Sequence, residues 1–206
     1  MPRPLQKSWL IFDIFSDRMN TMQTWLSSYE KNNYGDFFYA LMRLYQPEKV
    51  VELGTKAGYS AYHIARGLQA NGKGTLDCYD LWEKYPFHSV PKSVAQENLK
   101  EFRDIIGFKL GNVIGVDKTY KTVDILHVDV SNEGTVLEKI IPHWIDKVSQ
   151  LIIMEGGSPE RDKVPWMIKY KKEPIVKWLK AFKKRRKDIE YFTIEPLPSI
   201  TIINKK

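Results

Sequence analysis

The sequence predicts an α/β fold built on a mostly parallel β-sheet. From Pro47 onward, apolar segments of strand length alternate with segments of helix length, which is typical of βα units with right-handed crossovers. The last two apolar segments, residues 191–194 and 199–203, follow each other with only a short proline-containing link. These two must pair antiparallel, so we expect the sheet to end in a hairpin.

The elements follow from hydrophobic periodicity and from the residues that end each run. The pattern predicts helices over residues 36–45, 60–68, 93–106, 137–145 and 175–187. It predicts strands over residues 49–53, 74–79, 108–110, 123–128 and 150–154, in addition to the hairpin.

Before the first strand we expect a helical cap of two helices over residues 1–45, with a break at Asn32–Gly35. Residues 46–206 then form the core of a single domain. In the second helix Asp36 is the expected N-cap. The apolar stripe of that helix is expected at Phe37, Leu41, Leu44 and Tyr45.

Composition indicates a globular chain, since 43% of its 206 residues are hydrophobic and 28% are charged. The single cysteine, Cys78, excludes an internal disulfide and suits a reducing compartment. No apolar run approaches the roughly 20 residues that a membrane span needs. The apolar residues 9–12 are interrupted by Asp13, unlike a signal peptide. We therefore expect a cytoplasmic protein with no membrane partner.

The basic character of the chain is local. The net charge is +7, yet ten Lys or Arg residues stand against the single acid Glu173 between Lys169 and Lys187. Such a segment can bind nucleic acid, anionic lipid or an acidic substrate. However, Ile175, Trp178, Leu179 and Phe182 recur at helical spacing, which favours the solvated face of an amphipathic helix.

Residues 50–60, VVELGTKAGYS, predict a strand, a tight turn and a helix start that together hold an adenosyl cofactor. Gly54 permits a turn that a Cβ would obstruct, and Gly58 opens a helix whose free N–H groups favour an anionic group. Lys56 stands where a dinucleotide-binding turn needs glycine, which disfavours a nicotinamide or nucleotide-sugar enzyme. Glu52 adds negative charge and suits a cationic ligand, such as a sulfonium with an ammonium group.

Polar residues follow the next strands at the same edge of the sheet, where open α/β sheets bind ligands. Asp80 ends the second strand and can accept hydrogen bonds from ribose hydroxyls, or else cap a turn. Leu81 can line the adenine or ribose wall. Asn112, after the third strand, can flank adenine, although a plain turn fits it equally well.

Two carboxylates end the fourth and fifth strands. Asp129 can act as a base, a metal ligand or an anchor for a cofactor ammonium group, and Glu155 can join it. Alternatively, Glu155 pairs with Arg161 or a lysine. His127 is expected to be a buried, hydrogen-bonded histidine, whereas His88, in the loop after the second strand, is a further catalytic candidate.

The motifs VVELGTKAGYS, LDCYD and VDILHVDVSNEG, in this order, resemble the class I S-adenosylmethionine-dependent methyltransferases. The resemblance extends over residues 36–203 and is nearest to the small-molecule branch that includes the cephalosporin-biosynthesis type. It implies a Rossmann-like three-layer sandwich with seven strands in the order 3-2-1-4-5-7-6 and strand 7 antiparallel. S-adenosylmethionine is the implied cofactor.

The resemblance also implies roles for single residues. The family's cofactor loop falls on Glu52, Gly54 and Gly58, its ribose-binding acid on Asp80, and its acid after the fourth strand on Asp129. The methionine end of the cofactor falls near Thr55, Tyr59 and Ser60, and its adenine near Asn112. Relatives often carry Asp and His where this chain has Ser131 and Asn132, so a histidine base is not expected at this position. Metal-dependent members carry an acidic pair where Glu155 precedes Gly156, so a divalent metal is possible but unsupported.

The function expected from the resemblance is O-methylation of a small polar acceptor, such as a sugar or a natural product. Asp129, Glu155 and His88 are the catalytic candidates. One alternative is a nucleic-acid methyltransferase that uses residues 169–187 as its phosphate-binding surface. Another is a module that binds S-adenosylmethionine without turning it over.

Overall fold

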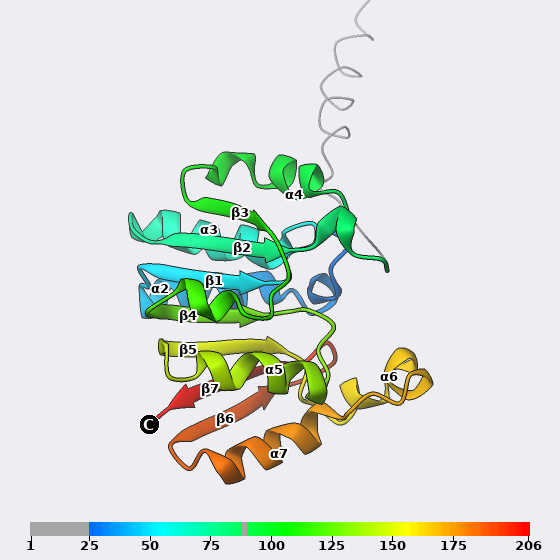
Figure 1. The fold of residues 1–206 in the computed structure, drawn as a ribbon. Coiled ribbons are helices and arrows are strands. Elements are labelled where there is room, and N and C mark those ends of the chain that lie inside the picture. Colours follow the sequence, from blue (N-terminus) through cyan, green and yellow to red (C-terminus); the bar gives the residue numbers. More distant parts are fainter. Residues whose placement is uncertain (1–24, 88–89) are drawn as a thin grey trace, which may run out of the picture.

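The computed structural model describes residues 25–87 and 90–206, and its centre is a seven-stranded sheet. The strand order is β3-β2-β1-β4-β5-β7-β6, as predicted, and β7 pairs antiparallel with both β5 and β6 (Figure 1). The other pairs are parallel. The strands are β1 (Lys49–Leu53), β2 (Thr75–Asp80), β3 (Ile106–Leu110), β4 (Val123–Val128), β5 (Val148–Glu155), β6 (Ile189–Ile194) and β7 (Ile200–Lys205).

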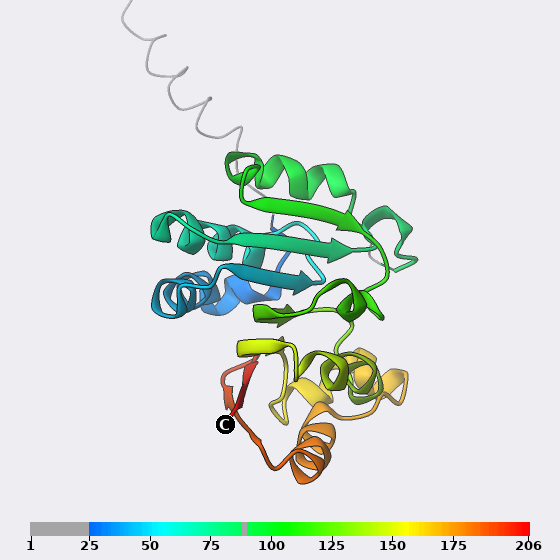
Figure 2. The same ribbon diagram turned by 60° about the vertical axis from the view of Figure 1, so that its left-hand side comes forward.

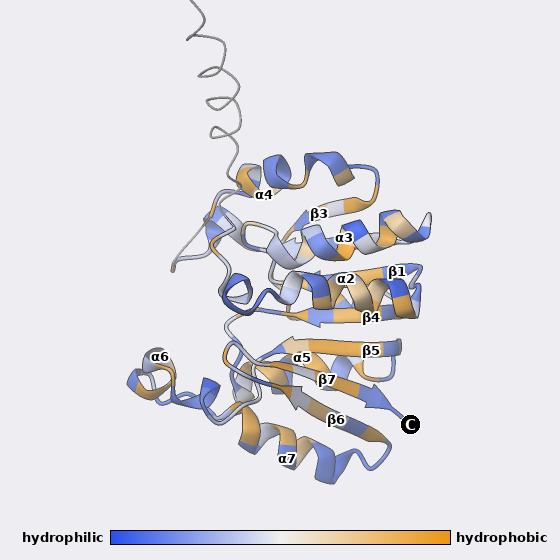
Figure 3. Ribbon diagram, turned by 180° about the vertical axis from the view of Figure 1, so that it is seen from behind, coloured by the Kyte–Doolittle hydropathy of each residue, from blue (hydrophilic) through white to orange (hydrophobic). Residues whose placement is uncertain are grey.

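Helices cover both faces of the sheet and make the predicted three-layer arrangement. Figure 1 shows α5 in front of the sheet and α7 beyond β6, and Figure 3 shows α2 and α3 on the opposite face. Side chains of α5 and α7 belong to the same core. The turned view in Figure 2 separates the layers. The α-helices are α2 (Tyr34–Tyr45), α3 (Tyr59–Asn71), α4 (Lys92–Asn98), α5 (Gly134–Trp144), α6 (Pro165–Lys169) and α7 (Ile175–Arg185). Short 3-10 helices are η1 (Ser28–Asn32), η2 (Trp82–Lys84), η3 (Lys100–Phe102), η4 (Val116–Thr119) and η5 (Arg161–Lys163).

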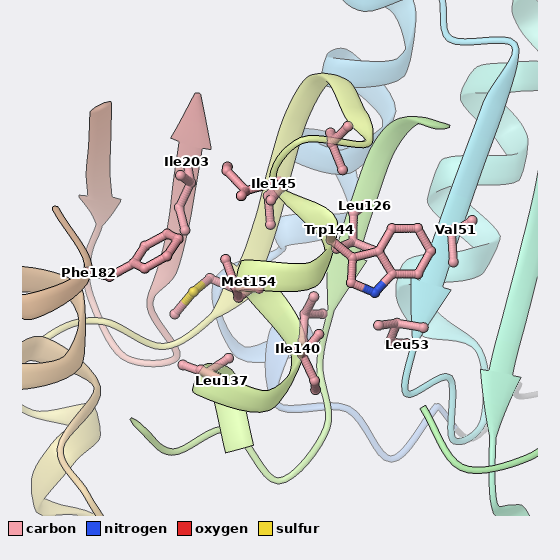
Figure 4. Close-up of a cluster of buried hydrophobic side chains, with 14 of the residues drawn as sticks. Val51, Leu53, Leu126, Leu137, Ile140, Trp144, Ile145, Met154, Phe182 and Ile203 are labelled. Carbon is pink, nitrogen blue, oxygen red and sulfur yellow. The ribbon is translucent and has the colours of Figure 1, made fainter. Parts of the chain in front are cut away.

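Alternating side chains of the central strands form two hydrophobic cores, one on each face. Val51 and Leu53 of β1 pack with Trp144 of α5, whereas Val50 belongs to the core under α2 and α3 (Figure 4). This alternation follows from the two-residue period of a strand. Because β1 and β4 are buried on both faces, their carboxyl ends are held rigidly at one edge of the sheet.

The start of α2 differs from the prediction. The helix begins at Tyr34, and its N-cap is Asn33 in a left-handed conformation (φ 52°), so Asp36 lies inside the helix. Gly35 does not break the helix. A Cβ at Gly35 would lie 2.3 Å from the ring of His63, so the glycine allows α2 to approach α3 closely.

The predicted stripe of α2 was also partly wrong. The buried side chains are Tyr34, Phe38 and Met42, at a spacing of four residues, while Leu44 is 75% exposed. The first predicted helix of the cap falls largely in residues 1–24, which lie outside the described residues. Residues 28–32 form the single turn of η1 instead of a longer helix.

The predicted helix over residues 93–106 is shorter in the structure. It ends at Asn98, continues as η3, and gives way to strand β3 at Ile106. Gly107 lies in this strand opposite Asp77, where a Cβ would lie 2.9 Å from the Asp77 carboxylate. Gly107 therefore faces the end of the Asp77 side chain within the sheet, and it does not end a helix.

Helix α7 confirms the amphipathic interpretation of the basic segment. Ile175, Trp178, Leu179 and Phe182 are buried against the sheet and α5. Several basic side chains have partners within the protein. Arg185 pairs with Glu138, Arg186 pairs with Asp146 and Asp188, and Lys183 donates to the carbonyl of Ile189. Within the described residues, no helix is long and apolar enough to cross a membrane.

Candidate active site at the carboxyl edge of the sheet

The polar residues singled out from the sequence meet where β2, β1, β4 and β5 end side by side. Gly54 donates its N–H to the carbonyl of Tyr79 at 2.8 Å, and Asp129 donates to the carbonyl of Leu53 at 2.8 Å. The first bond extends the pairing of β1 with β2 by one residue, and the second extends the pairing of β4 with β1. In the strand order β2-β1-β4-β5, the residues at the strand ends therefore follow one another as Asp80, Gly54, Asp129 and Glu155.

The loop after β1 approaches β4 so closely that only glycine fits at residue 54. Gly54 has φ +91°, and a Cβ there would lie 2.0 Å from the carbonyl oxygen of Asp129. Gly58 has φ +94°, and a Cβ there would lie 2.6 Å from Leu99. Both glycines are therefore required by packing and by a left-handed backbone, and the backbone of the loop lies directly against the end of β4.

Glu52 is fully buried, and four donors converge on its carboxylate. Ser60 Oγ at 2.6 Å and His127 Nδ1 at 3.0 Å contact Oε1. Thr55 Oγ1 at 2.8 Å and Cys78 Sγ at 3.6 Å contact Oε2. The cluster ties the loop and the start of α3 to strands β2 and β4. Thr55 and Ser60 direct their hydroxyl groups inward to Glu52, and His127 is the buried, hydrogen-bonded histidine that the sequence predicted.

Asp80 organises the backbone of the same loop. Its Oδ2 accepts from the N–H groups of Thr55 at 2.8 Å and Lys56 at 2.7 Å, and its Oδ1 accepts from that of Trp82 at 2.8 Å. The side chain of Asp80 is partly exposed. Since a carboxylate offers about four acceptor directions, one on Oδ1 is left for a further donor, such as a hydroxyl.

Asp129 occupies the centre of the edge and is partly exposed. Desolvation, and after it the negative charge of Glu155, raise the pKa of Asp129 to about 7, while the charges of His127 and Arg161 act in the opposite direction. A carboxyl group with a pKa near neutrality can take up a proton at physiological pH. The backbone carbonyl of Asp129 lies against Gly54 of the glycine loop.

Glu155 pairs with Arg161, which was the predicted alternative to a catalytic role. Its two oxygens accept from Arg161 Nε at 2.5 Å and Nη2 at 2.9 Å. Burial raises the pKa of Glu155, and the hydrogen bond and charge of Arg161 oppose this rise. Asn132, also buried, donates to the carbonyl oxygens of Val128 and Glu155 and so joins the ends of β4 and β5.

The remaining predicted residues lie around this centre. Tyr59 packs on α2, and its hydroxyl accepts from the N–H of Gly35 at 3.2 Å. Asn112 forms a turn, because its Oδ1 accepts from the N–H of Ile114 at 2.9 Å. Leu81 is partly exposed just before η2, in which Trp82 is buried and donates its indole N–H to the carbonyl of Lys56 at 3.0 Å. His88 lies outside the described residues.

The sequence did not single out Tyr29, which the structure brings to the edge. Tyr29 is fully buried in η1, and its hydroxyl lies 3.3 Å from His127 Nε2. Tyr29 and His127 are 98 residues apart in the sequence, so no local pattern could predict their contact. The only hint was the aromatic character of the segment before the first strand.

The carboxylates of this edge accept hydrogen bonds and carry negative charge, which fits a cationic cofactor that carries a ribose. Asp80 retains acceptor capacity, Asp129 is a second accessible carboxylate, and the charge of Arg161 is already balanced by Glu155. Both oxygens of Glu155 are occupied by Arg161, and the described part of the chain holds no group of three His, Cys, Asp or Glu side chains that could bind a metal ion.

Comparison with known proteins agrees with this geometry. Residues 51–152 match the family model Methyltransf_24, which describes a methyltransferase domain. No curated protein sequence matches the chain.

Several solved structures share the fold. An O-methyltransferase from Bacillus cereus, in complex with S-adenosylhomocysteine, is 15% identical with a TM-score of 0.64, covering 96% of this chain and 89% of that protein. The O-methyltransferase TomG from Streptomyces achromogenes, which is involved in tomaymycin synthesis and is in complex with S-adenosylmethionine, is 17% identical with a TM-score of 0.62, covering 84% and 80%. The S-adenosylhomocysteine-bound methyltransferase PaMTH1 from Podospora anserina is 13% identical with a TM-score of 0.65, covering both chains completely. At these identities the likeness shows the fold.

The strand order, the glycine loop after β1 and the matched family model identify the chain as a class I S-adenosylmethionine-dependent methyltransferase. The narrower resemblance to the cephalosporin-biosynthesis type is not confirmed by these matches.

Proposed function

We propose that the protein transfers a methyl group from S-adenosylmethionine to a hydroxyl of a small polar molecule, such as a sugar or a natural product. The observation that carries this proposal is Asp129. It is a partly exposed carboxyl group with a pKa of about 7, placed against the glycine loop. An O-methyltransferase needs a base close to the methyl donor, because a neutral hydroxyl is a weak nucleophile.

Several residues of the edge would hold the cofactor. Asp80 would accept from the ribose, and the loop of Gly54 and Gly58, with Thr55 and Ser60 fixed on Glu52, would hold the methionine end. Leu81 and Asn112 would flank the adenine. When bound, the cofactor supplies an activated methyl group on a sulfonium.

Asp129 would accept the proton of the acceptor hydroxyl while the oxygen attacks the methyl carbon. Glu155 would act indirectly, because its carboxylate holds Arg161 and raises the proton affinity of Asp129. Holding donor and acceptor in line contributes roughly 7–11 kcal/mol of the rate enhancement in such reactions. The aromatic pair Tyr85 and Phe87, joined to the β4 loop by a 2.8 Å hydrogen bond between Tyr85 and Ser131, would form one wall of the acceptor site.

The names of two structural neighbours support an oxygen acceptor, since the proteins from Bacillus cereus and Streptomyces achromogenes are both O-methyltransferases. Methylation of nucleic acid is less well supported. Of the four residues Lys183, Lys184, Arg185 and Arg186, three are engaged by partners within the protein, which leaves fewer cations for phosphate.

The test is methyl transfer from labelled S-adenosylmethionine to a panel of sugars, phenols and other hydroxylated metabolites, with RNA and DNA as further acceptors. We expect labelled ether products from the wild-type protein, and loss of transfer in Asp129→Asn even at concentrations of S-adenosylmethionine that saturate the variant. Binding of the cofactor with no transfer to any acceptor would indicate a non-catalytic module. Transfer to nucleic acid alone would contradict the proposed acceptor class.

A further inference from the structure

Residues 163–172, in the link between β5 and α7, form an arm that includes α6. Figure 1 shows α6 standing out from the sheet on the side where the arrows of β1, β4 and β5 end, and Figure 3 shows the same projection from behind. Within α6 only Met167 is buried. The arm therefore presents most of its side chains to its surroundings, at the same edge as the candidate active site.

Both ends of the arm are fixed. Just before the arm, Arg161 pairs with Glu155 at the end of β5, and its guanidinium lies over the ring of Trp166 at 5.1 Å from the centroid. At the other end, Lys172 donates its N–H to the carbonyl of Met167 at 2.9 Å, and the backbone turns through Lys171 with a φ of 48°. The outer side chains of the arm are thus held on a defined scaffold.

Large apolar side chains lie on the outside of this arm. Ile168 is 65% exposed and Tyr170 is 61% exposed. Trp166 is partly exposed as well. Single exposed apolar residues are ordinary on protein surfaces, but these three lie together within residues 166–170. Such a group is typical of a surface that contacts a partner.

The arm also carries positive charge that the protein does not balance. It contains four exposed lysines and no acidic residue, which gives it a charge of +4: Lys163, Lys169, Lys171 and Lys172. Within residues 25–87 and 90–206, none of the four forms an ion pair. The two flanking acids are engaged elsewhere, because Asp162 accepts from the N–H groups that begin α7 and Glu173 pairs with Lys177. The arm is therefore complementary to a negatively charged partner.

The mixture of side chains favours one kind of anionic partner. At a membrane surface, lysines attract anionic headgroups, tyrosine and tryptophan favour the headgroup region, and an aliphatic side chain such as Ile168 can enter the acyl boundary. A nucleic acid would use the lysines and the rings but would leave Ile168 in water. An anionic lipid surface gives every outer side chain of the arm a contact.

We propose that this arm docks the protein on anionic lipid surfaces, with the lysines on the headgroups and Ile168 and Tyr170 at the acyl boundary. The expectation that the protein has no membrane partner rested on the lack of a spanning segment, and docking on a surface needs none. Because the base of the arm is tied to Glu155, docking turns the carboxyl edge of the sheet toward the lipid.

The experiment measures sedimentation of the full chain with vesicles of phosphatidylcholine, alone or mixed with phosphatidylglycerol. We expect binding to the mixed vesicles that weakens with added salt, and much weaker binding to phosphatidylcholine alone. Replacement of three arm lysines together, Lys169→Gln, Lys171→Gln and Lys172→Gln, should lower the partition coefficient about 100-fold, from about fivefold for each lysine.

The matched control removes the same charge from another exposed segment, in and just after α7. It combines Lys180→Gln, Lys184→Gln and Lys187→Gln. Because exposed charges away from the contact are screened by salt, this variant should bind within about twofold of the wild type.

The apolar part of the contact has its own pair of variants. Ile168→Ser combined with Tyr170→Ser should lower the partition coefficient about 10-fold or more, because neither serine gains from leaving water. The control combines Leu44→Ser at the end of α2 with Phe192→Ser in β6, two apolar residues that are 75% and 57% exposed away from the arm. This control should bind as the wild type does.

Lys171→Gly separates binding from folding. Glycine adopts the positive φ of this position without strain, so the variant should melt at no lower temperature than the wild type. It should nevertheless bind the mixed vesicles about fivefold more weakly, because one cation is lost.

Three results would overturn the proposal. The first is no sedimentation of the wild type with the mixed vesicles, or arm variants that bind like their controls. The second is full binding by the variant with Ile168→Ser and Tyr170→Ser, because the arm would then not enter the lipid. The third is tighter binding to single-stranded RNA than to vesicles, lost in the lysine variant, which would make the arm a nucleic-acid surface. None of these measurements involves methyl transfer, so the proposed function stands or fails separately.

Discussion

Arg161 and Glu155 form a bidentate ion pair just beyond the carboxyl end of β5, with Nε at 2.5 Å and Nη2 at 2.9 Å from the two carboxylate oxygens. Both side chains are only 8% exposed. Arg161 also reaches the carbonyl of Asn132 at 3.3 Å, so the pair connects the loop after β5 to the loop after β4. The pair thereby fixes the position of the Glu155 carboxylate. Among the neighbouring charges, that of Glu155 has the largest effect on the pKa of Asp129.

Removal of Arg161 should destabilise the protein strongly. Arg161→Ala leaves a buried carboxylate without its counter-ion, a change that typically costs about 3–5 kcal/mol. The matched control is Lys177→Ala, which breaks an exposed pair with Glu173 and should cost under about 1 kcal/mol. Urea denaturation followed by circular dichroism measures both. Equal losses of unfolding free energy in the two variants would show that the buried Arg161 pair contributes no more to stability than an exposed one. Adding Glu155→Gln to Arg161→Ala removes the unpaired charge and should recover part of the lost stability.

Gly54→Ala should prevent the loop from closing on β4. The new Cβ would lie 2.0 Å from the carbonyl oxygen of Asp129, and the φ of +91° is unfavourable for alanine. We expect a loss of stability of at least about 2 kcal/mol and loss of S-adenosylhomocysteine binding. Gly72→Ala is the control, since Gly72 also has a positive φ (+68°) but nothing lies within 4 Å of its Cβ position. It should cost about 1 kcal/mol and leave binding intact. Calorimetric titration with S-adenosylhomocysteine separates the two variants, and unchanged binding by Gly54→Ala would contradict the assignment of the loop.

Asp80→Asn should weaken cofactor binding more than it weakens folding. The carboxylate accepts from three backbone N–H groups and keeps one free direction for a ribose hydroxyl, and an amide presents one acceptor oxygen instead of two. The expected loss is about 10- to 100-fold in Kd for S-adenosylhomocysteine, the equivalent of one charge-assisted hydrogen bond. Asp104→Asn, at an exposed position, is the control with unchanged Kd. An unaltered Kd in Asp80→Asn would exclude Asp80 from the ribose site.

The raised pKa of Asp129 predicts a dependence of stability on pH. The folded protein holds this proton up to a pKa of about 7, whereas the unfolded chain releases it near the ordinary value of about 3.9. The stabilisation is therefore complete below pH ~4 and is lost as the pH rises towards ~7.

An amide does not titrate, so Asp129→Asn does not lose stability as the pH rises. The variant should therefore be more stable than the wild type at pH 8, by about 2–4 °C in Tm, and this difference should shrink below pH 5. Asp188→Asn is the control of opposite sign, because Arg186 lowers the pKa of Asp188 to about 2 and the carboxylate stabilises the fold at neutral pH. Thermal melts between pH 4 and 9 test both. A Tm of Asp129→Asn that follows the wild type across this range would contradict the raised pKa.

Much of the fold could be predicted because it depends on local signals. Three of its features can be recognised within a few residues of sequence. They are the two-residue period of β1 and β4, the missing helix between the last two strands, and the glycines at residues 54 and 58. The predictions failed where long-range packing decides. Gly35 and Gly107 resemble breaks in the sequence, yet Gly35 lies in α2 against the ring of His63 and Gly107 lies in β3 opposite Asp77. Ile106, predicted as helix, joins β3 because β2 offers it a partner at Leu76.

The sequence by itself determined that Asp80, Asp129 and Glu155 stand at strand ends, since the ends of parallel strands are read from hydrophobic runs and turn residues. Only the tertiary structure decided what each carboxylate touches. Glu52 meets His127 across 75 residues, and His127 meets Tyr29 across 98. The physical reason is that burial and hydrogen bonding, which set the protonation of these groups, arise from neighbours brought together by the sheet. A strand end is a property of its own segment, whereas the pKa of Asp129 depends on several elements at once.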